Sequence, residues 1–473
     1  MNKAAPEWMS LDNAGKIFPG QNTDKWSNTF RVAVELKQEV DPTLLKKALD
    51  TTLERIPGFR VRIRKGAFWH YFEANPNSCP VRSDVGNFCY RINYKEDKGF
   101  LFRVFYRNKT ISLDIYHALC DGYGATVFLT TLTAEYLHLK GEAVSYNAIA
   151  LDTSEAPREE ELCDAYRKYA DSDMKYSYLD DWVYHCRGTK LPKHRANFTM
   201  GTMAFSQLHA VSKGYGVTVT ELLAGLLLDI HYRKMLQTEK TPKKVSVQIP
   251  VNLRKAFPTE SLRNFVLCLR AQLDPRKEEY SFEEVLSCVS TQLRGVNKPE
   301  ILNSMMTKNL KMEKQVARFM PLPLKNFAIG MGFKVTAEKS TSTLISNLGP
   351  VNMPEELKNQ VERFMFYTGP GIVNGARCGV ASLGDKLCFT FSNCYKEGDI
   401  EKEFFKRLTA MGVDVTVETN RKAEAVVWAD YFSVAENGFY SEELYQADKA
   451  EKTVIEKDDG VSRSERLRRV FHL

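Results

Sequence analysis

The sequence predicts an α/β protein made of two layered subdomains. Its 473 residues are too many for one core of ordinary size, and 43% of them are hydrophobic, which is enough to fill two cores. Alternating strand patterns and apolar helix patterns occur in both halves of the chain, without a short internal repeat. We therefore expect a mixed sheet covered by helices in each half.

The first half is expected to open with a strand, a helix and paired strands, at 30–36, 44–56 and 59–72. A β-hairpin follows over 101–116, because apolar residues alternate on both sides of Asn108-Lys109, a pair typical of a tight turn. A helix with one apolar side is expected from Thr126 onward. The hairpin thus ends next to a glycine-containing turn that leads into a helix.

A crossover connects the two halves over 141–194. Charged residues crowd the segment 152–164, and Pro157 interrupts its periodicity, although a helical piece is expected near 166–173. The expected units are an N-terminal subdomain with the crossover, a C-terminal subdomain and a partly mobile extension. They span 1–185, 186–420 and 421–473.

In the second half, two capping boxes predict helix starts. Thr218 with Glu221 opens a helix through Leu236, and Ser281 with Glu284 opens another. Further strands are expected at 245–251, 266–273, 364–367, 378–383 and 387–392, with a closing helix at 400–411.

The segment His117-Ala118-Leu119-Cys120-Asp121-Gly122 carries the strongest chemical signal. A neutral imidazole can take a proton from an attacking hydroxyl or amine when its other ring nitrogen is held by a hydrogen bond. Asp121 is expected to hold the turn by pairing with an arginine, and Gly122 lets a substrate or the backbone approach closely. The alternative is a packed histidine, with Asp121 only capping the next helix.

This motif resembles the His-x-x-x-Asp motif of the chloramphenicol-acetyltransferase-like superfamily, which includes condensation domains, plant acyltransferases, wax-ester synthases and alcohol acetyltransferases. Residues 41–69 resemble the opening helix and second strand of that family, and residues 8–19 resemble the start of its bacterial alcohol-acetyltransferase branch. The Asp-Phe-Gly-Trp-Gly segment of the plant branch is absent. The resemblance implies two chloramphenicol-acetyltransferase-like subdomains with an active-site channel between them.

Two later segments extend the resemblance. Asn252-Leu253-Arg254 follows a strand and is similar to the segment whose arginine pairs with the motif aspartate, so Arg254 is the expected partner of Asp121. Ser346-Asn347-Leu348-Gly349-Pro350 resembles the Ser-Asn segment that crosses the channel in the wax-ester and alcohol-acyltransferase branches. Ser346 and Asn347 are therefore candidates to donate to the oxyanion, with a simple turn as the alternative.

The resemblance implies a CoA-dependent O-acyltransferase. Acyl-CoA would be the donor, a small alcohol or hydroxylated molecule the acceptor, and His117 the general base, with no covalent intermediate, no permanently bound cofactor and no metal. Two alternatives stay open. One is a condensation-type N-acyltransferase that uses a carrier-protein thioester, and the other is a noncatalytic binding module on the same fold.

Charge and cysteine content narrow the expected partners. Of the net charge of +7, the segment 461–473 supplies four arginines and one glutamate, or 4 − 1 = +3. No nucleic-acid motif accompanies this charge, and a solvated tail is favoured over a membrane contact. We expect a chain ending near Ala450 to keep its activity.

The ten cysteines form no Cys-x-x-Cys pair, which favours buried thiols, and neighbouring strand residues point apart, which argues against Cys120 as a nucleophile. Without a secretion signal or a long apolar run, a cytoplasmic protein is expected.

Overall fold

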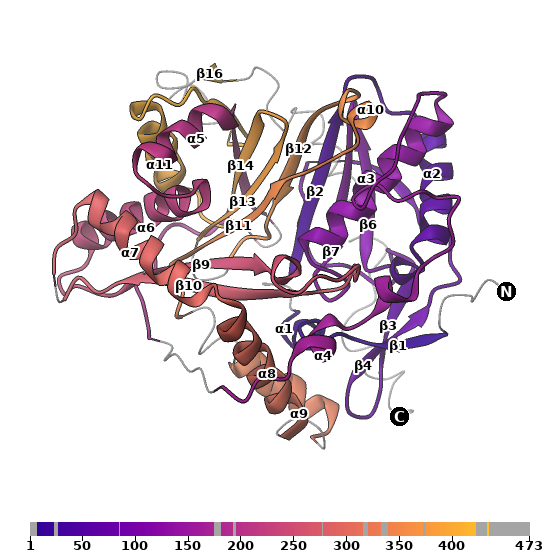
Figure 1. Cartoon of the computed structure of the whole chain (residues 1–473), viewed down its shortest axis with the longest axis horizontal. Coiled ribbons are helices and arrows are strands. Elements are labelled where there is room, and N and C mark those ends of the chain that lie inside the picture. The colour runs from indigo at the N-terminus through magenta and orange to yellow at the C-terminus, as the bar shows by residue number, and fades with distance from the viewer. Residues whose placement is uncertain are drawn as a thin grey trace, which may run out of the picture.

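The computed structural model describes residues 7–22, 27–84, 86–174, 181–192, 195–276, 278–315, 320–332, 339–371, 375–421 and 433–434. They form the predicted α/β architecture, with two large sheets side by side and helices on their outer faces (Figure 1). Most of the C-terminal extension lies outside the described residues.

The first half is built on a five-stranded sheet of order β12-β2-β7-β6-β5. Its strands are β2 (Thr29–Leu36), β5 (Val81–Ser83), β6 (Phe102–Arg107), β7 (Thr110–Tyr116) and β12 (Val361–Tyr367). The helices α2 (Pro42–Arg55) and α3 (Gly122–Leu139) cover one face. The predicted hairpin is confirmed as β6 and β7, which pair in antiparallel register around Asn108. Aromatic rings of Phe59, Phe102 and Phe128 pack together in this core.

The second half is built on an eight-stranded sheet of order β10-β9-β11-β13-β14-β8-β15-β16. Its strands are β8 (Asn197–Ala204), β9 (Val245–Asn252), β10 (Val266–Leu273), β11 (Thr343–Pro350), β13 (Ala376–Leu383), β14 (Lys386–Asn393), β15 (Thr416–Thr419) and β16 (Ser433–Val434). The covering helices are α5 (Phe205–Gly214), α6 (Val219–Thr238), α7 (Phe282–Val296) and α11 (Asp399–Ala410). Both predicted capping boxes are present, at the starts of α6 and α7.

Shorter elements complete the two halves. A small sheet joins β1 (Trp8–Ser10), β4 (His70–Ala74) and β3 (Val61–Lys65). The remaining helices are α1 (Phe18–Gln21), α4 (Ala165–Tyr169), α8 (Pro299–Gln315), α9 (Leu322–Gly332) and α10 (Glu355–Lys358). Within the described ranges, 3-10 turns lie at Gly15–Ile17, Pro57–Phe59, Glu159–Leu162 and Leu253–Lys255.

The two halves share a strand. β12 lies within residues 186–420, yet it pairs with β2 at the edge of the first sheet. From β12, the Arg363 guanidinium contacts Glu35 in β2 and Glu418 in β15, so one cation connects both sheets. The expected second subdomain therefore contributes one strand to the first sheet.

Because of this shared strand, we expect the two halves to unfold as one cooperative unit. Circular dichroism and intrinsic fluorescence should report coincident transitions in urea, and the calorimetric and van't Hoff enthalpies should agree. Two separate transitions would show that the halves are independent despite β12.

The ten cysteines are free thiols in the structure, and six of them are buried as expected, whereas Cys163, Cys268, Cys288 and Cys394 are partly exposed. Across the described part of the chain, no helix is long and apolar enough to cross a membrane. The same residues contain no group of three or more His, Cys, Asp or Glu that could hold a metal ion.

Candidate active site

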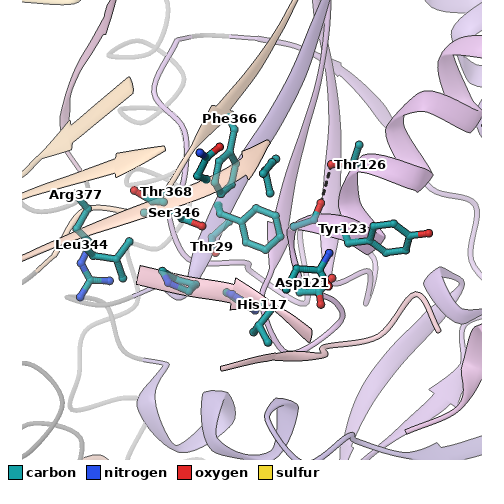
Figure 2. A pocket seen from close by; sticks show the side chains of 18 of the residues that line it. Thr29, His117, Asp121, Tyr123, Thr126, Leu344, Ser346, Phe366, Thr368 and Arg377 are labelled. Carbon is teal, nitrogen blue, oxygen red and sulfur yellow. Dashed lines mark hydrogen bonds between the residues drawn. The ribbon is translucent and has the colours of Figure 1, made fainter. Parts of the chain in front are cut away.

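A cavity of about 330 Å³ lies between the two halves. Its lining includes His117 and Gly122 from the first half and Asn252, Ser346 and Arg377 from the second. Figure 2 shows His117 at this pocket, with Asp121 on the side of α3 and with Ser346 and Arg377 on the side of β11 and β13. The structure thus brings the residues of the predicted channel to one cavity.

His117 follows β7 directly and is clamped by its surroundings. Its backbone N–H donates to the Asn28 carbonyl oxygen at 2.9 Å. Its ring stacks on Phe18 from α1, with centroids 4.6 Å apart, and meets Phe30 from β2 edge-on at 5.1 Å. Aromatic contacts on two sides leave the imidazole little freedom to rotate.

Asn264 determines which ring nitrogen of His117 faces the pocket. The Asn264 Oδ1 atom lies 3.0 Å from His117 Nδ1, and the Asn264 Nδ2 group donates to Asp12 Oδ2 at 3.1 Å. Because Asp12 is the acceptor for the amide nitrogen, the amide oxygen must accept from the ring. Nδ1 therefore carries the proton, and Nε2 is the unprotonated ring nitrogen.

The surroundings shift the pKa values of His117 and Asp12. Burial lowers the pKa of His117 below its usual 6.5, although hydrogen bonds to its own backbone, to Asn264 and to the Cys120 backbone, together with the Asp121 charge, act in the opposite direction. Burial raises the pKa of Asp12 to about 6, in spite of the nearby Arg263. At neutral pH the imidazole is therefore uncharged while Asp12 is largely ionised.

These shifts predict where activity falls on the acid side. A general-base role for His117 would require a neutral imidazole beside an ionised Asp12, so we expect the acid limb of kcat/KM below pH 6.5, the ordinary histidine value. A pH profile with a saturating donor tests this expectation. An acid limb above pH 6.5 would contradict the assigned environment of the imidazole.

Asp121 faces the protein interior more than the cavity. Its side chain is 1% exposed, and Oδ1 accepts from the Gly124 N–H at 3.1 Å, which caps α3. Oδ2 accepts from Arg254 Nη1 at 2.7 Å and from the Phe265 N–H at 2.8 Å. The predicted contact between Asp121 and Arg254 is present, and Asp121 caps α3 in addition rather than only capping it.

Arg254 holds the loop that carries Asn264. Its guanidinium donates to the carbonyl oxygens of Ser261, at 2.8 and 3.1 Å, and of Arg263, at 2.6 Å. It also lies 4.4 Å from the centre of the Tyr123 ring. Asp121 and Arg254 therefore fix the approach of this loop to α3, and so position Asn264 against His117.

Two glycines allow the halves to meet closely. A Cβ atom at Gly122 would lie 2.4 Å from Cδ2 of Leu348 in β11, and one at Gly124 would lie 2.0 Å from the Leu262 carbonyl oxygen. The space beside Gly122 is therefore filled by the Leu348 side chain rather than left open for a substrate. The space beside Gly124 is filled by the backbone of the loop that Arg254 holds. The carbonyl oxygen of Gly122 accepts from Thr126 within α3 (Figure 2).

Ser346 and Asn347 lie on strand β11, and both line the cavity. Asn347 Nδ2 donates to Thr220 Oγ1 at 2.9 Å, and Asn347 Oδ1 accepts from the Gly349 N–H at 2.7 Å. Gly349 has a φ of +75°, so the expected turn is also present, at the end of the strand. Structural contacts engage the Asn347 side chain, which favours Ser346 as the donor to a substrate.

Sequence reasoning missed Asp12, Asn264 and Phe18 as members of the site. Asp12 and Phe18 belong to the segment 8–19. The resemblance of this segment to the alcohol-acetyltransferase branch was the signal that its residues could contribute to the site. Asn264 had no such signal. It lies 147 positions from His117 in the sequence and follows no recognised motif.

No protein-family model matches the chain, and neither does any curated protein sequence. Solved structures do match. Polyketide synthase associated protein 5 from Mycobacterium tuberculosis matches with a TM-score of 0.54 and 14% identity, over 84% of this chain and 96% of that one. TRI101 from F. graminearum in complex with coenzyme A and deoxynivalenol matches with a TM-score of 0.57 and 11% identity, over 85% and 97%.

An epimerization domain, from the third module of tyrocidine synthetase B, matches with a TM-score of 0.53 and 14% identity, over 87% of this chain and 97% of that one. These similarities extend over nearly the full length of all three structures. The chain therefore has the predicted fold of two chloramphenicol-acetyltransferase-like subdomains, which these structures share.

Proposed function

We propose that this protein is an acyltransferase that moves an acyl group from acyl-CoA to a hydroxyl acceptor, with His117 as the general base. The observation that carries the proposal is the hydrogen bond between His117 Nδ1 and Asn264, which leaves Nε2 for an acceptor in the cavity. The fold, shared with TRI101 in complex with coenzyme A, supports the choice of donor.

The proposed reaction has two steps. Nε2 takes the proton of the acceptor hydroxyl while its oxygen attacks the thioester carbonyl carbon, and a tetrahedral oxyanion forms. As this intermediate collapses, the carbon–sulfur bond breaks and the imidazolium returns the proton to the CoA sulfur. The products are an ester and free CoA, and no acyl group is attached to the enzyme.

The oxyanion needs a donor on the second sheet or at the start of α3. Ser346 is the favoured side chain, because it lines the same cavity as His117 while Asn347 is bound to Thr220 and Gly349. Gly122, the first residue of α3, has a backbone N–H without a partner inside the helix, and it also lines the cavity. Asp121 and Arg254 act by positioning, without touching the substrate.

Asn264→Ala should lower kcat by less than the ~10²–10⁴ expected when a general base is lost. The variant removes the Asn264 acceptor at Nδ1 and weakens the preference for one tautomer, while the hydrogen bonds of the imidazole to the His117 and Cys120 backbone remain. The Asn264 bond raises the pKa of His117, so its loss should also move the acid limb of kcat/KM to lower pH. A purely structural role would lower activity with an unchanged pH profile.

A second candidate is a condensation-type enzyme that transfers an acyl group from a carrier-protein thioester to an amine. The similarity to a structure of the nonribosomal peptide synthetase FmoA3, at 13% identity and a TM-score of 0.52, favours it. The same histidine would serve both reactions, so the donor must be varied directly. A noncatalytic binding module is disfavoured, because His117, Asp121 and Gly122 are all intact at the cavity.

The deciding experiment is a screen of acyl-CoA donors against alcohols and amines, with CoA release followed by a thiol reagent and products identified by mass. The proposal predicts an ester with at least one alcohol. A matched assay with acyl groups on phosphopantetheinyl carrier proteins separates the two candidates. Amide formation from the carrier alone would favour the second one.

A further inference from the structure

Helix α9 has its polar and apolar sides reversed. Leu324, Phe327 and Met331 are exposed by 55%, 67% and 47%, while Lys325 is 2% exposed. The Lys325 ammonium donates to the Phe68 carbonyl oxygen and lies 3.5 Å from the centre of the Trp69 ring. Surface helices normally turn their apolar stripe inward. Here the helix buries its cation and presents an apolar stripe to the outside.

The body of the protein holds this helix firmly. The Leu322 N–H donates to the Ala67 carbonyl oxygen at 3.0 Å, at the tip of the β3–β4 hairpin. On α1, Gly20 packs so tightly that a Cβ atom there would lie 3.1 Å from Cγ2 of Ile329. Figure 1 shows α8 and α9 protruding together at one end of the molecule. The apolar stripe is therefore a fixed, convex ridge.

Positive charge accompanies the ridge. Residues 299–332 contain five lysines and arginines and two glutamates, which gives 5 − 2 = +3, although one of the five cations is the buried Lys325. Lys308 and Lys311 are exposed on α8, next to Met312, which is 58% exposed. One of the two glutamates, Glu313, is paired with Lys16 at 2.6 Å and with Arg167 at 2.9 Å. The segment thus combines protruding apolar side chains with exposed cations.

We propose that α9 docks this protein on the surface of an anionic phospholipid bilayer. Leu324, Phe327 and Met331 enter the headgroup region, and the lysines of α8 face the lipid phosphates. A bilayer accepts a convex ridge without a complementary groove, which a protein partner would have to supply. The docked side also adjoins the candidate active site, because α1 packs under α9 and carries the Phe18 ring that stacks on His117.

Flotation of the full-length protein with vesicles tests the proposal. Vesicles of equal parts phosphatidylcholine and phosphatidylglycerol are compared with pure phosphatidylcholine. The wild type should float with the anionic vesicles and lose this binding at high salt. The combined variant Leu324→Ser, Phe327→Ser, Met331→Ser should bind at least ~10-fold more weakly, and Lys308→Glu with Lys311→Glu should also weaken binding.

A matched control replaces two exposed leucines on other helices, Leu139→Ser and Leu236→Ser, and should float like the wild type. Unchanged melting temperatures show that the variants are folded. Hydrogen exchange on vesicles should protect 322–332. The proposal is overturned if the wild type ignores anionic vesicles, if the α9 variant floats normally, or if protection falls only on 451–473. The proposal is also overturned if the wild type is a dimer that does not bind vesicles and the α9 substitutions convert this dimer to monomers.

Discussion

Replacing His117 with alanine is expected to lower kcat/KM by ~10²–10⁴ while leaving the fold intact. The ring lies at a cavity between the halves, and Asn264 holds its Nδ1. Without the imidazole, a bound hydroxyl has no group to take its proton, so the loss should appear in kcat for every acceptor. Steady-state kinetics with the best donor and acceptor measures it.

The control for this variant is His209→Ala. His209 is exposed on α5, in the other half of the molecule, and its loss should leave kcat/KM unchanged. Circular dichroism should show that both variants are folded. Near-normal turnover by folded His117→Ala protein would remove His117 from the chemistry.

The second large effect is expected at the ion pair between Asp121 and Arg254. Both side chains are almost fully buried, at 1% and 7% exposure, and breaking such a pair from one side leaves an uncompensated charge, at a typical cost of ~3–5 kcal/mol. Asp121→Asn and Arg254→Met should therefore each lower the melting temperature. Both should also lower activity, because the loop that carries Asn264 loses its anchor.

A double-mutant cycle tests whether the pair acts as one unit. The combined losses should be smaller than the sum of the single losses, because either variant alone already breaks the contact. Arg158→Met is the matched control. Its carboxylate partners and the arginine itself are about half exposed, so we expect an effect of ~0–1 kcal/mol. Fully additive losses at Asp121 and Arg254 would mean that their contact contributes nothing.

Elements specified by neighbouring residues could be predicted from the sequence. The hairpin around Asn108, the capping boxes at Thr218 and Ser281, and the strand Val266–Leu273 are all present where they were expected. Each depends on a turn, a cap or an alternation within a few residues. The helix after His117 begins at Gly122 rather than Thr126, because Asp121 caps it despite two glycines in its first turn.

Features that depend on distant partners could not be predicted. The sequence predicts a strand at 364–367, within β12, but it does not show that this strand joins the first sheet across more than 300 positions. The strand Asn197–Ala204 and the helices α8 and α9 were not expected, and α9 departs from the usual pattern because its apolar residues face outward. The family resemblance predicts the contact between Arg254 and Asp121. The position of Asn264 beside His117 instead depends on how its loop folds, which no local pattern indicates.

The central claim is that ester and CoA form together through the imidazole of His117. The most direct test measures both products in one reaction, with wild-type protein and with His117→Ala, and the enzyme's mass after acyl-CoA alone. We predict one ester for each CoA released by the wild type, background release by the variant, and an unmodified enzyme. An acyl adduct on the protein, or equal ester formation by the variant, would contradict the proposed mechanism.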